Sequence, residues 1–249
     1  DDETNNLTAI FPYELYHTGG DEAKTKCYEA DNATVEWYTL KGMNASSVWP
    51  YFVNTNAQMV SEVFGRKPIA WNDAYTDDGN SAMDPRLTFM WWTTPEYGKE
   101  FRQCAQDDGH KVIAASGNPL YLSLGEYDNK HIYEYDPCDC NGLNCVNTTE
   151  GCKNVLGMST AFWTSDFDAS NLLGALFPRA VVSAERMWSS PDLKGYTNSS
   201  QASPAVTDRL GDMRCRLMQR GVPVLPIFAD WDVTYAGSRP GEAGSCMNQ

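Results

Sequence analysis

The sequence predicts an α/β fold built on a parallel sheet, and two observations carry that prediction. Five β-prone runs follow one another along the chain, and each is followed by a polar loop or by a plausible helix. Alternation of strands and helices is typical of a parallel sheet with crossover helices. The runs are Tyr13–His17, Pro68–Trp71, Leu87–Trp92, Lys111–Ser116 and Val155–Trp163.

The segments between and after these runs supply the helices and loops. No internal repeat and no linker interrupts the chain, so we expect residues 1–249 to form a single domain. The helical candidates are Ala57–Phe64, Glu96–Asp107, Leu172–Met187 and Ala205–Arg220. Loops rich in Gly, Asp, Asn or Ser are expected at Asp77–Asn80, Asp136–Gly151 and Ser190–Ser203.

The composition limits the kinds of molecule that this protein can be expected to bind. The 249 residues are 42% apolar, which is enough for a sizeable core, and 33 acidic against 19 basic residues give a net charge of -14. Nucleic acids and anionic membranes select basic surfaces, so we expect neither as a partner. We find no apolar run long enough to span a bilayer and no signal peptide. An acidic or extracellular compartment suits this charge.

Sequons and cysteines indicate the secretory pathway. Five Asn-x-Ser/Thr sequons accompany eight cysteines, a combination that favours a secreted, lysosomal or vacuolar glycoprotein. We expect glycans on the five sequon asparagines, which are Asn6, Asn32, Asn44, Asn147 and Asn198.

Four of the cysteines cluster in one Gly/Asn-rich stretch, at positions 138, 140, 145 and 152. Disulfides are the favoured interpretation, and a zinc knot is the alternative. The cluster has no Cys-x2-Cys pair and contains no histidine, which argues against zinc. We therefore expect no metal and no cofactor.

Two adjacent carboxylates, Asp21 and Glu22, follow the first β-prone run after Gly19 and Gly20. Neighbouring side chains of a strand point in opposite directions, but a turn at the strand end can direct both acids to one site. Glycines permit the backbone geometry that such a turn requires. One acid of a pair can then remain protonated as a proton donor while the other stays ionised. The plain alternative is a Gly-Gly turn with two solvated acids.

The segment His17–Glu22 resembles the His-x-Gly-Gly-Asp-Glu signature of the family 20 glycoside hydrolases, the β-N-acetylhexosaminidases. The similarity continues in family order over nearly the whole chain, and together the matching segments are specific. They are Lys26–Glu29, Ile69–Asn72, Phe89–Trp92, Pro119–Leu122, Ala161–Trp163, Phe177–Ser190 and Arg214–Pro223.

The resemblance implies a (β/α)8 TIM barrel in which the Gly-Gly-Asp-Glu motif closes the fourth strand. The five runs would then be strands four to eight, and the first three strands have no counterpart. A five-stranded arc leaves open edges and an unfilled interior. We therefore expect the chain to be the C-terminal part of a barrel, completed by an N-terminal chain of the same precursor. Cys27 is the expected disulfide link to it.

The resemblance also assigns roles to the acids. Glu22 matches the general acid that protonates the leaving oxygen, for which we expect it to be buried. Asp21 matches the acid that orients the 2-acetamido group of the substrate. The carbonyl oxygen of that group attacks the anomeric carbon, so the reaction is substrate-assisted and retaining and needs no carboxylate nucleophile.

Aromatic residues complete the implied sugar site. Trp71, Trp92 and Trp163 match tryptophans that line it, because an aromatic face suits the C–H bonds of a sugar ring. Core packing is the alternative for any tryptophan, and we expect it for Trp91. Tyr121 matches the tyrosine that hydrogen-bonds the acetamido carbonyl. We expect His17 to be structural.

Two departures and one disulfide complete the comparison. Ser123 and Ser165 stand where the family usually has acids that hold the 4- and 6-hydroxyls of the terminal sugar. Cys215 and Cys246 resemble a disulfide pair of the animal members.

The resemblance implies a β-N-acetylhexosaminidase that removes terminal N-acetylhexosamine from glycans or glycoconjugates. The alternative is a non-catalytic, carbohydrate-binding or structural glycoprotein subunit, which the two serines favour. A homo- or heterodimer is possible within this family.

Overall fold

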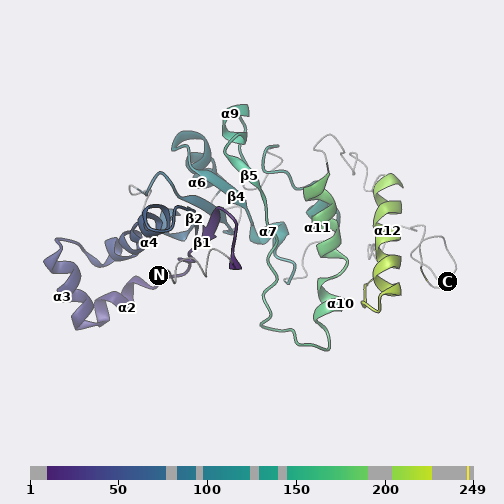
Figure 1. Ribbon diagram of the computed structural model, residues 1–249, viewed down its shortest axis with the longest axis horizontal. Coiled ribbons are helices and arrows are strands. Elements are labelled where there is room, and N and C mark those ends of the chain that lie inside the picture. The colour runs from purple at the N-terminus through teal and green to yellow at the C-terminus, as the bar shows by residue number, and fades with distance from the viewer. Residues whose placement is uncertain are drawn as a thin grey trace. The chain divides into compact units, whose positions relative to one another are not determined.

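The computed structural model describes residues 10–76, 83–93, 98–123, 129–139, 145–189, 204–225 and 246 (Figure 1). The chain divides into two compact units. The first contains Asp1–Ala114 and Pro137–Gly157, and the second contains Ala115–Asp136 and Met158–Gln249. The loops predicted at Asp77–Asn80 and Ser190–Ser203 lie outside the described residues, as do the sequon asparagines Asn6 and Asn198.

The sheet has the predicted architecture. Its strands are β1 (Leu15–His17), β2 (Lys67–Trp71), β3 (Thr88–Trp91), β4 (Lys111–Ala114) and β5 (Val155–Met158), in the order β1-β2-β3-β4-β5. The pairs β1·β2, β2·β3 and β3·β4 are parallel. The α/β parallel-sheet prediction is thereby confirmed. Because neighbouring strands run the same way, their carboxyl ends meet at one edge of the sheet.

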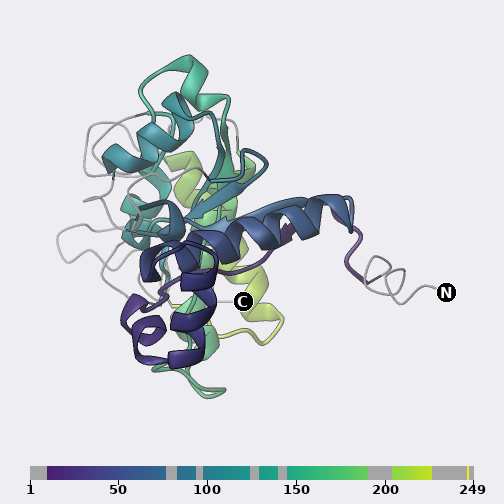
Figure 2. The ribbon, with the colours of Figure 1, turned by 90° about the vertical axis from the view of Figure 1, so that its left-hand side faces the viewer.

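The helices of the first unit include one that was only half predicted. α4 (Ala45–Glu62) buries Trp49, Val53, Ala57 and Val60, spaced as one face of a helix, and packs against β2 (Figure 2). The sequence predicted that this helix begins at Ala57.

The other helices of the first unit are α2 (Thr25–Ala30), α3 (Asn32–Leu40), α5 (Asp73–Thr76), α6 (Gly98–Arg102), the π-helical turn η2 (Gln103–Asp107) and α9 (Thr149–Cys152).

An aromatic cluster fills the core beside β3. Phe89 and Trp91 are fully buried on the same face of that strand. The ring of Trp91 lies 5.4 Å from that of Phe101, and the ring of Phe89 lies 5.1 Å from that of His110. Tyr75 joins the cluster from α5. The prediction that Trp91 belongs to the core is confirmed.

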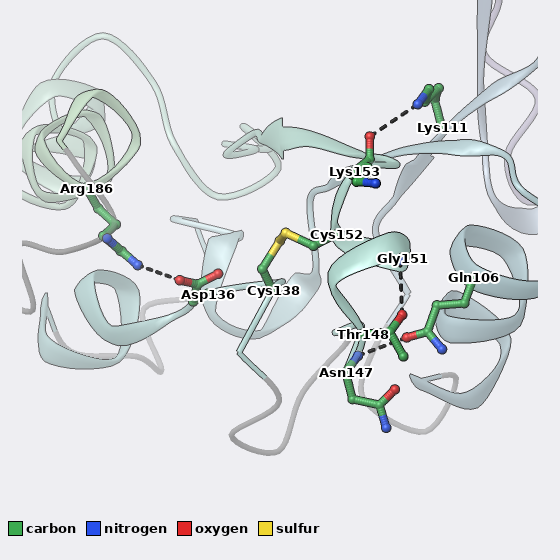
Figure 3. The surroundings of a disulfide bond; sticks show 10 residues. All are labelled: Gln106, Lys111, Asp136, Cys138, Asn147, Thr148, Gly151, Cys152, Lys153 and Arg186. Atoms are coloured by element: carbon green, nitrogen blue, oxygen red, sulfur yellow. Dashed lines mark hydrogen bonds and ion pairs between the residues drawn. A yellow bond between two sulfur atoms is a disulfide. The ribbon is translucent and has the colours of Figure 1, made fainter.

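The cysteine-rich segment is tied by a disulfide between Cys138 and Cys152 (Figure 3). Cys145 is also disulfide-bonded, and position 140 lies outside the described residues. The backbone N–H of Asn147 donates to Gln106 Oε1 at 2.9 Å, which joins this segment to η2. No group of three or more His, Cys, Asp or Glu within the described part of the chain is arranged to hold a metal.

The second unit is helical, with α7 (Gly117–Leu120), α8 (Asn129–Glu134), α10 (Leu172–Leu176), α11 (Arg179–Trp188) and α12 (Pro204–Gln219). α11 packs against α8, and against α12, beside which it lies in Figure 1. The core cluster of this second unit comprises Leu122, Ile132, Tyr133, Val182 and Leu210.

Two details of this unit bear on the predictions. The helix predicted over Leu172–Met187 is interrupted at Phe177 and Pro178, since proline lacks the N–H that a continuous helix uses. A disulfide joins Cys215 and Cys246, the pair that the resemblance implies.

The sequon asparagines at positions 32, 44 and 147 are exposed. Over the ranges that the structure describes, no helix combines the length and the apolar character needed to cross a membrane.

Candidate active site

The turn after β1 is fixed by hydrogen bonds to β2. The backbone N–H and the hydroxyl of Thr18 both donate to the Ile69 carbonyl, at 2.8 and 3.0 Å. The Trp71 N–H donates to the Gly19 carbonyl at 3.1 Å. The segment that carries the two acids is therefore anchored to the neighbouring strand immediately before it turns.

The two glycines have the backbone geometry that the sequence predicts for them. Gly19 has φ +73° and Gly20 has φ +93°, both in the region that side chains disfavour. A Cβ on Gly20 would lie 3.2 Å from Val53 Cγ2, whereas a Cβ on Gly19 would meet nothing within 4 Å. The indole N–H of Trp49 also donates to the Gly20 carbonyl at 3.1 Å.

We expect Gly20→Ala to destabilise the protein more than Gly19→Ala. Alanine at 20 combines a strained φ with a tight contact, at a cost of roughly 2–3 kcal/mol. Alanine at 19 has open space and a φ near the left-handed region, at a cost of about 1 kcal/mol. Denaturant unfolding of the two variants measures the difference. Equal losses would show that the contact with Val53 does not constrain the turn.

Asp21 and Glu22 are both exposed within the described residues. The burial expected for Glu22 is therefore not provided by this part of the chain. Glu22 has φ +50°, an uncommon value for a residue with a Cβ. Its backbone N–H donates to Asp73 Oδ1 at 3.0 Å.

Asn72 and Asp73, at the end of β2, are the site residues that sequence reasoning missed. Both are buried, with Asp73 5% exposed. Asn72 Oδ1 accepts the backbone N–H of Trp92 at 2.9 Å, and Asn72 Nδ2 donates to Thr93 Oγ1 at 3.0 Å. Asp73 Oδ2 accepts the indole N–H of Trp92 at 2.6 Å. The position of Asp73 near a strand end was visible in the sequence, because it lies two residues after the β-prone run Pro68–Trp71, but its contacts were not.

Burial raises the pKa of Asp73, and the charge of Asp21 adds to that rise. The hydrogen bonds from the Trp92 indole and the Glu22 N–H oppose it. The pKa of His17 moves the other way. Burial lowers it, with the charge of Asp21 as the smaller, opposing influence, so the neutral ring is favoured.

His17 packs against Trp71, the first of the predicted sugar-site tryptophans. The two ring centroids lie 4.9 Å apart. His17 Nδ1 accepts the backbone N–H of Gly19 at 2.9 Å, which places the proton of the neutral ring on Nε2. These contacts are those of a structural residue, and Trp71 and Trp92 remain half-buried at the ends of their strands.

The other predicted residues lie in the second unit. Tyr121 forms an isolated parallel bridge with Ala161, and the rings of Tyr121 and Trp163 lie 6.4 Å apart. The backbone N–H of Trp163 donates to Ser123 Oγ at 3.2 Å. Trp163 is 50% exposed and Ser165 is exposed.

The structure thus brings the predicted residues together in two groups. Asp21, Glu22, Trp71 and Trp92 lie at the carboxyl ends of three successive strands, where α/β barrels collect catalytic groups. Tyr121, Ser123 and Trp163 form the second group, within the second unit. A pair of acids beside half-buried tryptophans is suited to protonating an oxygen of a bound sugar.

Comparisons with known proteins agree with this arrangement. Residues 2–191 match the model of the glycosyl hydrolase family 20 catalytic domain. Beta-hexosaminidase 1 of Arabidopsis thaliana is 29% identical over 244 residues, which are 98% of this chain and 42% of that protein. The beta-hexosaminidase subunit beta of Sus scrofa is 29% identical over 90% of this chain and 40% of that protein.

A solved structure shares the fold. The exo beta-N-acetylglucosaminidase from Vibrio harveyi, in complex with N-acetylglucosamine, aligns with a TM-score of 0.68 at 16% identity, over 89% of this chain and 34% of that one. Together with the parallel sheet, this likeness fits a TIM-barrel-type domain. The chain belongs to glycosyl hydrolase family 20 and spans about two fifths of the length of the relatives it matches, 42% of the plant protein and 40% of the porcine subunit.

Proposed function

We propose that this protein is a retaining β-N-acetylhexosaminidase that removes terminal N-acetylhexosamine from glycans. The observation that carries the proposal is the placement of Asp21 and Glu22 directly after β1, beside the strand ends that hold Trp71 and Trp92. Family membership and the names of the relatives support it. Those names describe hexosaminidases, and they do not favour the non-catalytic alternative.

Each residue of the site has a role in this proposal. Glu22 donates a proton to the leaving glycosidic oxygen, and Asp21 orients the 2-acetamido group. The acetamido carbonyl oxygen attacks the anomeric carbon, and water then opens the resulting oxazolinium-type ring with retention. Trp71, Trp92 and Trp163 contact the sugar faces, and Tyr121 donates a hydrogen bond to the acetamido carbonyl.

We also propose that this sheet is the C-terminal part, strands four to eight, of a barrel that an N-terminal segment of the same precursor completes. β1 ends the described sheet order, and its neighbourhood leaves large apolar side chains exposed. They include Leu15, Tyr16, Tyr13 and Phe11, at 40, 42, 79 and 54%. Covering such surface is what a further strand and its crossover helix do.

Localisation and assembly complete the proposal. Exposed sequons at Asn32, Asn44 and Asn147, together with disulfides, support glycosylation and a secreted, lysosomal or vacuolar protein. Relatives named as hexosaminidase subunits support a homo- or heterodimer.

The two serines predict weak binding of simple N-acetylglucosaminides. Ser123→Asp with Ser165→Glu restores two charged acceptors for sugar hydroxyls, each worth ~1.5–3 kcal/mol. We expect kcat/KM on aryl N-acetylhexosaminides to rise by at least about tenfold. The introduced aspartate could still accept the Trp163 N–H that Ser123 Oγ now accepts. An unchanged kcat/KM in an active parent would mean that other groups already hold those hydroxyls, and Asp166, the exposed acid next to Ser165, is the first candidate.

One assay tests the proposed function. The whole protein should release the chromophore of an aryl β-N-acetylglucosaminide and leave the matching aryl β-glucoside intact, because only the former carries the acetamido nucleophile. Equal hydrolysis of both, or of neither, would contradict the proposal.

A further inference from the structure

Asp73 is a buried carboxylate whose two oxygens contact two different parts of the proposed site. Oδ1 accepts the backbone N–H of Glu22 at 3.0 Å, and Oδ2 accepts the indole N–H of Trp92 at 2.6 Å. Asp73 follows β2, which lies between β1 and β3 in the sheet. The Asp73 side chain therefore links the segment after β1 to the segment after β3, and its own strand, β2, lies between them.

This geometry favours the ionised form. A carboxylate presents two acceptor oxygens, whereas an amide of the same shape presents one acceptor and one N–H₂ donor. Asparagine at 73 could keep only one of the two hydrogen bonds, and its N–H₂ would face the other donor. An amide has the same shape as the carboxylate, so it is the second acceptor oxygen of the carboxylate, and not the shape of the side chain, that the bridge needs.

Folding stability does not explain the charge. Burial raises the pKa of Asp73 above its ordinary value, and the charge of Asp21 raises it further. A carboxyl with a raised folded pKa destabilises the folded protein as pH rises above the range in which the unfolded carboxyl titrates. At neutral pH the charge of Asp73 therefore costs stability, which is the pattern of a group kept for its geometry.

Glu22 is the residue for which this geometry matters. Its φ of +50° is uncommon for a residue with a Cβ, and its side chain is exposed. The hydrogen bond that its N–H donates to the buried Asp73 carboxylate fixes the backbone from which the Glu22 carboxyl projects. The same buried group fixes the plane of the Trp92 ring through its indole N–H.

We propose that Asp73 is a positioning residue that sets the acid Glu22 and the sugar-stacking ring of Trp92 relative to each other. The inference rests on the proposed function. In that proposed reaction Asp73 itself contacts none of the atoms that react. Small misplacement of a proton donor lowers kcat steeply, by as much as about 10²-fold for a shift of about 1 Å.

The test is Asp73→Asn in the whole protein. With an aryl N-acetylglucosaminide of poor leaving ability we expect kcat to fall by about 10- to 100-fold. KM should change by less than kcat does, because the other residues that contact the substrate are unchanged. The melting temperature at pH 7 should change little, because relief of the buried charge offsets the hydrogen bond that is lost. The indole N–H resonance of Trp92, assigned by its loss in Trp92→Phe, should move in spectra of protein with ¹⁵N-labelled tryptophan.

Tyr75→Phe is the matched control. It lies in the same helix α5 and removes a hydrogen bond of the same 2.6 Å length, from the Tyr75 hydroxyl to Asp108 Oδ2. Neither partner contacts Glu22 or Trp92 in the hydrogen bonds of the described residues. We expect this variant to lose melting temperature and to keep its kcat and its Trp92 indole resonance.

The outcomes separate the inference from the proposed function. A parent that hydrolyses no N-acetylhexosaminide refutes the proposed function, and the Trp92 resonance then decides the geometry: movement in Asp73→Asn supports the bridge, and no movement overturns it. In an active parent, an unchanged kcat in Asp73→Asn overturns the positioning role. The positioning role is also overturned if Asp73→Asn and Tyr75→Phe lose kcat and melting temperature to the same extent.

Discussion

Glu22→Gln should lower kcat on substrates with poor leaving groups by at least ~10²-fold, the effect expected when general acid catalysis is lost. Glutamine keeps the size of the side chain and cannot donate a proton to the glycosidic oxygen. Activated aryl substrates need less protonation, so their kcat should fall much less. Steady-state kinetics over a series of aryl leaving groups measures the contrast.

Two further variants sharpen this result. Asp21→Asn should slow both kinds of substrate and weaken inhibition by a thiazoline mimic of the cyclic intermediate, because Asp21 acts on the acetamido group. Glu36→Gln, at an exposed position of α3, removes a glutamate to which the proposal gives no role and should leave kcat unchanged. An equal loss on every leaving group in Glu22→Gln would remove Glu22 from the acid role.

Residues 1–249 produced without further sequence should not melt as a stable, cooperative monomer. The exposed apolar side chains beside β1, which ends the sheet order of the described residues, favour self-association over a single folded species. Light scattering and thermal melting compare this fragment with the whole protein. Whole-protein material should also show a disulfide at Cys27, which is exposed and free in this chain.

A monodisperse fragment with a sharp transition and full activity would contradict the proposal that an N-terminal segment completes the barrel. Full activity in the fragment would also place every catalytic group within these residues. An inactive but well-folded fragment would instead locate missing substrate contacts in the remaining sequence.

The central strands β2, β3 and β4 could be predicted because their burial leaves a plain signal in the sequence. β2 reads Lys-Pro-Ile-Ala-Trp and is buried over its centre, so a short apolar run marks it without any alternation. The predicted and observed strands differ only at their ends. For the run Val155–Trp163, the strand stops at Met158 and an isolated bridge follows at Ala161.

Helices without a buried stripe could not be predicted in the same way. α2 and α3 contain no buried residue, so no apolar periodicity distinguishes them from a polar loop. The start of α4 was missed although Asn44 caps it by accepting the Ser47 N–H at 3.0 Å. Pro50 lies in its second turn, and burial of Val48 and Trp49 outweighs the poor propensity there.

The residues of the candidate site also divide into those that the sequence could predict and those that it could not. The acids and tryptophans stand next to strand ends, so sequence position alone brought out Asp21, Glu22, Trp71 and Trp92. The role of Asp73 depends on contacts with a residue 51 positions away and with the indole of Trp92. Neither the direction of that side chain nor its burial is visible in the order of the residues.

The central claim, that the substrate's own acetamido group is the nucleophile, has one direct test. Fluorine atoms on the acetyl methyl withdraw electrons from the carbonyl oxygen and weaken it as a nucleophile, while the leaving group stays the same. The kcat of the whole protein should fall steeply from the acetyl through the mono-, di- and trifluoroacetyl aryl glucosaminides. A kcat that stays level across the four substrates would contradict it, because the oxygen that attacks the anomeric carbon would then come from elsewhere.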